Sequence, residues 1–115
     1  NDENGHPAGD AALTGVGRLL SDAVRTVDHV GRYGGEEFLV ILSHTDDESA
    51  RHTAERLRSL LEAHSFGAGP PPRHITASIG VATYPGASAR SPVELLKEAD
   101  RALYRAKEAG RNRVE

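Results

Sequence analysis

Two carboxylates stand directly after two glycines in the stretch RYGGEEF, residues 32–38. Glu36 and Glu37 follow Gly34 and Gly35, and the apolar run FLVIL begins at the next residue. Neighbouring carboxylates repel each other, and a plain turn does not need them. Mg²⁺ binds one or two carboxylates together with phosphate oxygens and water, and glycines let a phosphate come close to the backbone. On this stretch alone the interpretation stays open between a solvated hairpin tip and a site for a metal-bound phosphate.

A second group of polar residues stands in NDENGHPAGD, residues 1–10. Asp10 falls at the start of the first helical pattern, where a carboxylate commonly caps the helix. The functional alternative is recognition of guanine, because a carboxylate accepts hydrogen bonds from both guanine N1–H and the exocyclic amine. Adenine has neither donor on that edge, so this contact discriminates strongly. Asn1 could donate to the guanine carbonyl or accept from its amine.

Cations gather in AKEAGRNR, residues 106–113. Lys107 falls in the last turn of a predicted helix and Arg111 just beyond it, where positive charges favour the helix dipole. The same two residues could hold nucleotide phosphates, with Arg111 as a forked donor and Lys107 as a point charge. Both interpretations stay open on these residues alone.

A further pair, Arg25 and Asp28, precedes the two glycines. Arg25 could be a cation at the end of a helix and Asp28 a turn former. Alternatively, the pair binds a phosphate and a guanine edge as a second site. The six histidines show no zinc-like spacing and are interpreted as surface or packing residues: His6, His29, His44, His52, His64 and His74.

The apolar spacing predicts the elements that must hold these groups. From Asp10 to Val27, steps of three and four predict one helix face, formed by Leu13, Val16, Leu20, Val24 and Val27. Residues 28–33 and 37–42 flank the glycines and predict a β-hairpin, in which paired glycines suit the positive φ angles of a tight turn. In a strand, Glu36 and Glu37 would point to opposite faces. The unbroken run FLVIL predicts a strand covered on both faces.

The second half of the chain continues this pattern. Residues 45–48 form a capping box, and the helix behind it carries the buried stripe Ala50, Ala54, Leu57 and Leu61. Residues 66–72 predict a loop, and alternation predicts a strand through Ile75, Ala77, Ile79 and Val81. A second capping box at 91–94, with Pro92 at the first helical position, starts a helix that runs to about Ala109 and stops at Gly110. RNRVE begins a last strand. The order predicts an α+β sandwich with one sheet.

Composition excludes several classes of protein. The chain has 115 residues, of which 27% are charged and 37% hydrophobic, as in one soluble globular domain. The net charge of −3 argues against a general nucleic-acid or membrane-surface binder. No apolar run approaches the roughly 20 residues of a membrane span, and we expect no signal peptide. The absence of cysteine excludes disulfides and thiolate chemistry and suits the cytoplasm.

Together, these motifs resemble the GGDEF family, the diguanylate cyclases, over essentially the whole chain. NDENGHPAGD is similar to the family's ND-x-x-GH-x-x-GD, and RYGGEEF to its signature hairpin with Glu at the third position. ASIGVA at 77–82 resembles a family strand, and ADRALYRAKEAGRNRV at 99–114 its closing helix. Arg25 and Asp28, followed by five residues and then the glycines, match its inhibitory product site.

The resemblance implies a fold and a reaction. The fold is a nucleotidyl-cyclase-like, ferredoxin-like sandwich, with helices packed on one mainly antiparallel sheet, in a single domain over residues 1–115. The reaction condenses two GTP into cyclic di-GMP and releases two pyrophosphates, in a site between the antiparallel domains of a homodimer.

Each functional residue of these family motifs has a matching position in this sequence. The resemblance implies that Glu36 is the catalytic metal ligand for Mg²⁺ or Mn²⁺ and that Glu37 has a supporting role in the active site. By the same resemblance, Asn1 and Asp10 are expected to recognise guanine, and Gly34 and Gly35 to lie along the nucleotide. Lys107 and Arg111 are expected to bind the β- and γ-phosphates. The resemblance also implies an inhibitory product site formed by Arg25, Asp28 and Arg56.

The sequence departs from the family pattern at its beginning. The family has a strand carrying D-x-D-x-F-K before its first motif, with an acidic metal ligand and a carbonyl ligand. The sequence begins at Asn1, inside that motif, so we expect an N-terminally incomplete domain without its first strand. Turnover by these 115 residues stays open, with a non-catalytic cyclic di-GMP receptor or a dimerisation module as alternatives. A sensor or regulatory domain is expected outside them, and nucleic-acid or membrane partners are not.

Overall fold

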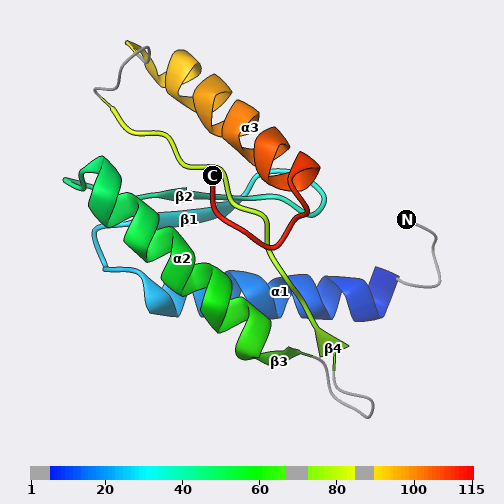
Figure 1. Cartoon of the computed structure of the whole chain (residues 1–115). Helices are drawn as coiled ribbons and strands as arrows, with labels where there is room; N and C mark the ends of the chain where they lie inside the picture. Colours follow the sequence, from blue (N-terminus) through cyan, green and yellow to red (C-terminus); the bar gives the residue numbers. More distant parts are fainter. Residues whose placement is uncertain (1–5, 67–72, 85–89) are drawn as a thin grey trace. The chain divides into compact units, whose positions relative to one another are not determined.

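A computed structural model describes residues 6–66, 73–84 and 90–115 of the chain (Figure 1). Its helices are separated by pairs of short antiparallel strands, which confirms the α+β class. The order is α1 (His6–Ala23), β1 (His29–Arg32), β2 (Phe38–Ile41), α2 (Asp47–Ala63), β3 (Ser65–Phe66), β4 (Arg73–His74) and α3 (Pro92–Glu108). None of the helices in these ranges combines the length and the apolar character that crossing a membrane requires.

The chain divides into two compact units. The first comprises Asn1–Ser43 and Ala63–Ile75, and the second His44–Glu62 and Thr76–Glu115. Where the sequence predicts one sheet, the described strands pair as two antiparallel ladders, β1 with β2 and β3 with β4. The prediction of a single domain over residues 1–115 stays a prediction.

The first unit is built on α1, whose buried residues Ala12, Val16 and Leu20 repeat at every fourth position. Aromatic rings lie against two glycines of this helix. A Cβ at Gly15 would meet Phe66 Cδ1 at 3.1 Å, and one at Gly17 would meet Phe38 Cε2 at 3.2 Å. The glycines therefore let the hairpin and β3 pack close to α1. Phe66 was predicted in a loop but is buried in β3, and residues 67–72 lie outside the described ranges.

The helix predicted to reach Val27 ends at Ala23 instead. The carboxylate of Asp28 accepts a hydrogen bond from the backbone N–H of Arg25 at 3.0 Å, and the N–H of Asp28 donates to the carbonyl of Arg25 at 2.9 Å. These bonds form a turn in place of the next helical hydrogen bonds. Val27 consequently leaves the apolar face and is 55% exposed.

The β1–β2 hairpin pairs His29 with Ile41 and Arg32 with Phe38. The prediction that the FLVIL run is covered on both faces is wrong. Phe38–Val40 are half-buried and Ile41 is 52% exposed, since β2 pairs only with β1 within the described residues.

The second unit contains α2 and α3. The predicted stripe of α2 is confirmed, since Ala50, Ala54, Leu57 and Leu61 are buried. Its cap is Asp46 rather than the predicted Thr45, because Asp46 Oδ1 accepts from the N–H of Ser49 at 2.8 Å.

The start and the interior of α3 also follow the sequence. Ser91 caps α3 as predicted, with its Oγ accepting from the N–H of Glu94 at 3.2 Å and Pro92 in the first turn. The small residues Ala102 and Ala106 form the most buried part of α3.

The two strands predicted at 75–81 and 111–115 form only a short parallel bridge, between Ile79 and Val114. The N–H of Ile79 donates to the carbonyl of Arg113, and the N–H of Glu115 donates to the carbonyl of Ile79, both at 2.9 Å. A Cβ at Gly80 would overlap with the backbone of Ala99 and Leu103. The glycine of ASIGVA therefore lets this segment lie directly against α3.

Candidate functional site

The acidic residues of the hairpin lie in the loop of residues 33–37 between β1 and β2. The carbonyl of Glu37 accepts from the N–H groups of Tyr33 at 2.7 Å and Gly34 at 3.3 Å. The guanidinium of Arg32 donates to the carbonyl of Gly35 from Nη2 at 2.6 Å and from Nε at 3.1 Å. These contacts fix a longer loop than the tight turn predicted.

The loop corrects two expectations. Positive φ was predicted for the paired glycines, but Gly110 is the only glycine with positive φ in the described part of the chain. Glu36 and Glu37 were predicted on opposite faces of a strand, but β2 begins at Phe38, so both lie in the loop. A five-residue connection can follow a turn that needs no positive φ at its glycines.

Both carboxylates are exposed. Within the described ranges, neither the Glu36 nor the Glu37 side chain forms a hydrogen bond or an ion pair. A Cβ at Gly35 would meet nothing within 4 Å, and one at Gly34 would lie 3.5 Å from Glu37 Oε1. The loop thus presents two acidic oxygen donors beside open backbone. No group of three or more His, Asp or Glu able to hold a metal occurs among the described residues.

The residues proposed to read guanine lie near the N-terminus. Asn1 lies outside the described residues. Asp10 lies inside α1, about one turn beyond its first residue His6, so the alternative interpretation as an N-cap is wrong. The Asp10 side chain is outside the described part of the structure, and its function stays a prediction.

The cations Lys107 and Arg111 flank the C-terminal end of α3, and both are exposed. The N–H of Arg111 donates to the carbonyl of Ala106 at 2.9 Å, and the N–H of Gly110 donates to that of Lys107 at 3.4 Å. These are the two hydrogen bonds of a Schellman motif, with Gly110 at φ 125° in the position that favours glycine. The predicted stop at Gly110 is confirmed.

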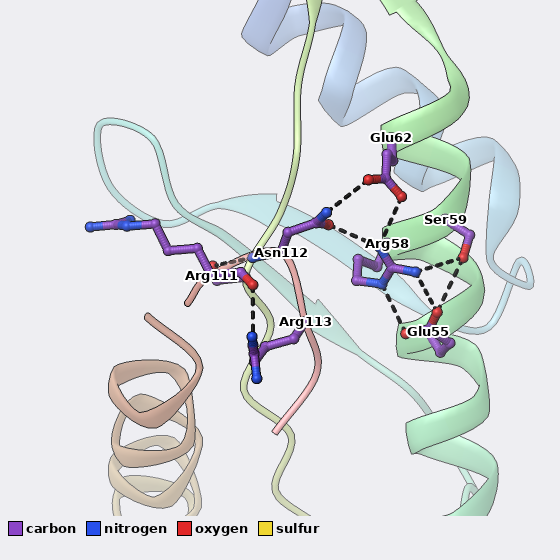
Figure 2. Close-up of polar contacts among 8 residues, drawn as sticks. Glu55, Arg58, Ser59, Glu62, Arg111, Asn112 and Arg113 are labelled. Carbon is purple, nitrogen blue, oxygen red and sulfur yellow. Dashed lines mark hydrogen bonds and ion pairs between the residues drawn. The ribbon is translucent and has the colours of Figure 1, made fainter. Parts of the chain in front are cut away.

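The backbone stays in the left-handed region after Gly110, at φ 65° for Arg111 and 46° for Asn112. Residues with a Cβ seldom adopt this conformation, although Asn tolerates it. Asn112 is held from several sides (Figure 2). Its Oδ1 accepts from Arg58 Nη1 at 2.8 Å, its Nδ2 donates to Glu62 Oε2 at 2.8 Å, and its N–H donates to Ser78 Oγ at 3.2 Å. We call Arg58, Glu62, Ser78 and Asn112 the Asn112 network.

Sequence reasoning missed this network. Arg58 could be recognised as an ion-pair partner of Glu55 and Glu62, which lie three residues before it and four after it on α2. These carboxylates raise the pKa of Arg58, and hydrogen bonds from Asn112 and then Arg58 lower the pKa of Glu62. Nothing in the spacing connects α2 with Asn112.

Arg25 and Asp28 form a hydrogen-bonded ion pair in the first unit. Asp28 Oδ1 accepts from Arg25 Nη2 at 2.9 Å and from the N–H of Ser43 at 3.0 Å, while Oδ2 accepts from Arg25 Nε and N–H, both at 3.0 Å. The Asp28 side chain is 2% exposed and that of Arg25 55%. Hydrogen bonds from Arg25, and then from Ser43, lower the pKa of Asp28 to about 2. Arg56 is exposed on α2, in the second unit.

Comparisons with known proteins agree with these motifs. The family described as "Diguanylate cyclase, GGDEF domain" matches residues 1–113. The chain is 40% identical over 114 residues to diguanylate cyclase A of Treponema denticola, a match that covers 99% of the chain and 30% of the relative. The chain therefore spans less than a third of that relative's length.

Two solved structures are similar to the whole fold. The active GGEEF domain of a diguanylate cyclase from Vibrio cholerae has a TM-score of 0.85 at 33% identity, covering 95% of this chain and 68% of that one. The GGDEF domain of DgcB from Caulobacter crescentus, solved in complex with c-di-GMP, has a TM-score of 0.83 at 31% identity, covering 96% and 65%. Because the family match runs from residue 1 to residue 113, this chain belongs to the GGDEF family of diguanylate cyclase domains.

Proposed function

We propose that this chain is the catalytic domain of a diguanylate cyclase, which condenses two GTP into cyclic di-GMP and releases two pyrophosphates. The observation that carries the proposal is the loop of residues 33–37, where Glu36 and Glu37 are exposed and lack side-chain partners among the described residues. Two adjacent carboxylates without a counterion suit a cationic ligand. The similarity to a named diguanylate cyclase over 99% of the chain supports the same function.

Glu36 would hold the metal ion, Mg²⁺ or Mn²⁺, because both ions prefer oxygen ligands and Mg²⁺ needs only one or two protein carboxylates beside substrate phosphates. The bound metal would supply Lewis-acid stabilisation of the phosphate oxygens. Glu37 supports Glu36 by adding negative charge to the same loop. The open backbone at Gly35 leaves room for the nucleotide to approach.

Lys107 and Arg111 would contact the β- and γ-phosphates. In the reaction, the 3′-hydroxyl of one GTP attacks the α-phosphorus of the other and loses its proton. The new O3′–P bond forms as the bond to the β-phosphate oxygen breaks, and pyrophosphate leaves with the electron pair. Cations at the β- and γ-phosphates stabilise the charge that develops on this leaving group. Each domain holds one GTP, so the reaction requires a homodimer.

Asp10 and Asn1 would select guanine. Asp10 does not cap α1, which removes the main structural explanation for a carboxylate at this position. An Asp10 contact to the two guanine donors makes the site a poor binder of ATP.

Cyclic di-GMP would also inhibit the enzyme at Arg25, Asp28 and Arg56. A related domain has been solved with c-di-GMP, which makes product binding a reasonable expectation here. Because both oxygens of Asp28 already accept hydrogen bonds, we assign the direct contact to the partly exposed guanidinium of Arg25 and an orienting function to Asp28. A regulatory domain outside the chain stays a prediction.

The proposal is tested by incubating the domain, preceded by a strand with the family's D-x-D-x-F-K pattern, with Mg²⁺ and either GTP or ATP and identifying the products by mass. We expect cyclic di-GMP from GTP, no product without the metal, and little reaction with ATP. Asp10→Ala should lower the ratio of GTP affinity to ATP affinity by at least about tenfold, the scale of one hydrogen bond to a charged group. Asp22→Ala, exposed on the same helix, is the control. Equal affinities for GTP and ATP in the unaltered protein would refute the guanine site.

A further inference from the structure

The Asn112 network contains none of the residues proposed to bind GTP, the metal ion or cyclic di-GMP. Arg58 Nη1 donates both to Glu62 Oε1 at 3.1 Å and to Asn112 Oδ1 at 2.8 Å, and Asn112 Nδ2 donates to Glu62 Oε2 at 2.8 Å. The three side chains thus form a closed ring of hydrogen bonds, and the Arg58 side chain is 15% exposed. All three residues belong to the second unit.

Stabilising α2 does not require this ring. Arg58 is already held on its own helix by Glu55, with Nε to Oε1 at 2.9 Å and Nη2 to Oε2 at 2.6 Å, and by Glu62. What the ring adds is a fixed position for the amide of Asn112. Because Asn112 is the second of two consecutive left-handed residues, fixing it also fixes the backbone of Arg111.

The turn is held on both sides of Arg111. Before it, Gly110 and the hydrogen bond from Arg111 N–H to the carbonyl of Ala106 end the helix. After it, Asn112 is held by the ring and by Ser78 Oγ. The carbonyl of Arg111 itself accepts from Arg113 Nε at 3.2 Å. Figure 2 shows the Arg111 side chain extending away from the ring, and its guanidinium forms no hydrogen bond or ion pair with the described residues.

We propose that Arg58, Glu62 and Asn112 are positioning residues that orient Arg111 toward the β- and γ-phosphates of GTP. The inference rests on the proposed function of Arg111. A forked guanidinium binds phosphate well only when its plane is correctly directed, so the backbone from which it projects must be fixed. The ring requires an amide at position 112, because one end accepts from Arg58 and the other donates to Glu62.

The test compares affinities for GMP and for a GTP analogue with a non-hydrolysable α,β bond. Only the analogue carries the phosphates that Arg111 would contact. Asn112→Asp keeps the side-chain shape but loses the donor and places a carboxylate beside Glu62. We expect it to lower the analogue-to-GMP affinity ratio by about tenfold, the scale of one displaced charged hydrogen bond. Arg51→Ala, exposed on α2, is the control.

A second variant restores the ring by exchanging the amide and the carboxylate between positions 112 and 62. In the double variant Asn112→Asp with Glu62→Gln, the amide at 62 donates to the carboxylate at 112, and Arg58 keeps an acceptor on each. We expect the ratio to recover to within about threefold of the unaltered protein. Recovery of thermal stability without recovery of the ratio would overturn the proposal, because the ring would then be structural only.

Arg111→Ala separates this inference from the proposed function. If Arg111→Ala leaves the ratio unchanged, the phosphate function of Arg111 is wrong and the positioning inference is wrong with it. If Arg111→Ala lowers the ratio and Asn112→Asp does not, only the positioning inference is overturned. If both lower it, Asn112→Asp should have no further effect on the ratio in the Arg111→Ala background, since the residue that it positions is gone.

Discussion

The loop of residues 33–37 and the turn that follows α3 carry opposite charges and are built in opposite ways. In the loop, Glu36 and Glu37 are exposed and have no side-chain partners among the described residues. In the turn, Arg111 is exposed but its backbone lies between a Schellman motif and the Asn112 network. The carboxylates have no cation paired with them among the described residues, whereas the backbone that carries the cation is held by hydrogen bonds.

This difference follows from what each charge would bind. Mg²⁺ keeps several of its waters and binds only one or two protein carboxylates beside substrate phosphates, so a carboxylate on an exposed loop can serve as its ligand. A guanidinium must match a phosphate through a fixed fork of donors, so its direction has to be set beforehand. Substitutions in the loop should therefore change function alone, and those in the turn should change function and stability together.

The largest effect is expected from Glu36→Gln in the domain preceded by a strand with the D-x-D-x-F-K pattern. The amide keeps the shape of the side chain and removes the charge that a divalent metal requires, so we expect cyclic di-GMP formation to fall at least about a hundredfold. The free energy of unfolding should change by no more than about 0.5 kcal/mol, because the side chain is exposed and has no partner in the described residues. Product formation and denaturant unfolding measure the two quantities.

Glu48→Gln, exposed at the start of α2, controls for the loss of one negative charge. Product formation by Glu36→Gln near the parental rate would remove Glu36 from the site. A large loss of stability would show that the loop is as strongly supported as the turn, which would break the comparison.

The pair in the first unit extends the comparison to a second cation. Arg25 is held by a nearly inaccessible carboxylate, as Arg111 is held through its backbone. We expect Arg25→Ala to weaken cyclic di-GMP binding by roughly 1.5–3 kcal/mol, the range for hydrogen bonds to charged groups, and also to lower stability because it leaves Asp28 without its cation. Titration calorimetry measures the affinity.

Arg56→Ala removes an exposed side chain and should weaken product binding without affecting stability, so it tests the site independently of folding. Arg51→Ala is the matched control on the same helix. Unchanged affinity in both Arg25→Ala and Arg56→Ala would rule out a product site at these residues.

Two glycines give a smaller and more direct test. Gly110 has φ 125°, and a Cβ there would lie 2.8 Å from Arg113 Nη2, so Gly110→Ala should cost about 1–3 kcal/mol of stability. Gly35 has open space and no positive φ, so Gly35→Ala should stay within about 0.5 kcal/mol and act instead on nucleotide binding. Thermal unfolding and a GTP titration compare the two. Equal losses of stability would contradict the contrast between loop and turn.

The sequence predicts most of what depends on local pattern. The buried stripe of α2, the Ser91 cap and the stop at Gly110 follow from spacing and side-chain chemistry within a few residues, and all are confirmed. The family motifs also identify the GGDEF family without reference to geometry. Patterns within short stretches of the sequence were therefore sufficient to predict these helix features and to identify the family.

The misses share a different cause. The end of α1, the cap at Asp46 and the form of the hairpin each depend on a side-chain or backbone hydrogen bond that competes with the expected one. The link between Arg58 and Asn112 joins residues far apart in the chain, so no periodicity could reveal it. Sequence reasoning found the charged residues of the candidate site, but not the network that fixes one of them.

The smallest effect is expected in the stability of the protein at acidic pH, and it depends on the ion pair of Arg25 and Asp28. The folded protein holds the pKa of Asp28 at about 2, below its ordinary value of 3.8, chiefly through hydrogen bonds from Arg25 and Ser43. As the pH falls through this window, the unfolded chain takes up a proton at Asp28 before the folded protein does, so stability declines. Above about pH 5 this contribution is complete. Asp28→Asn cannot bind that proton, so its deficit in stability should be largest near neutral pH and should narrow toward pH 2. Urea unfolding at several pH values measures the difference, with Asp22→Asn as the control for removing one charge. A deficit that stays constant across the window would mean that Asp28 contributes through shape rather than charge.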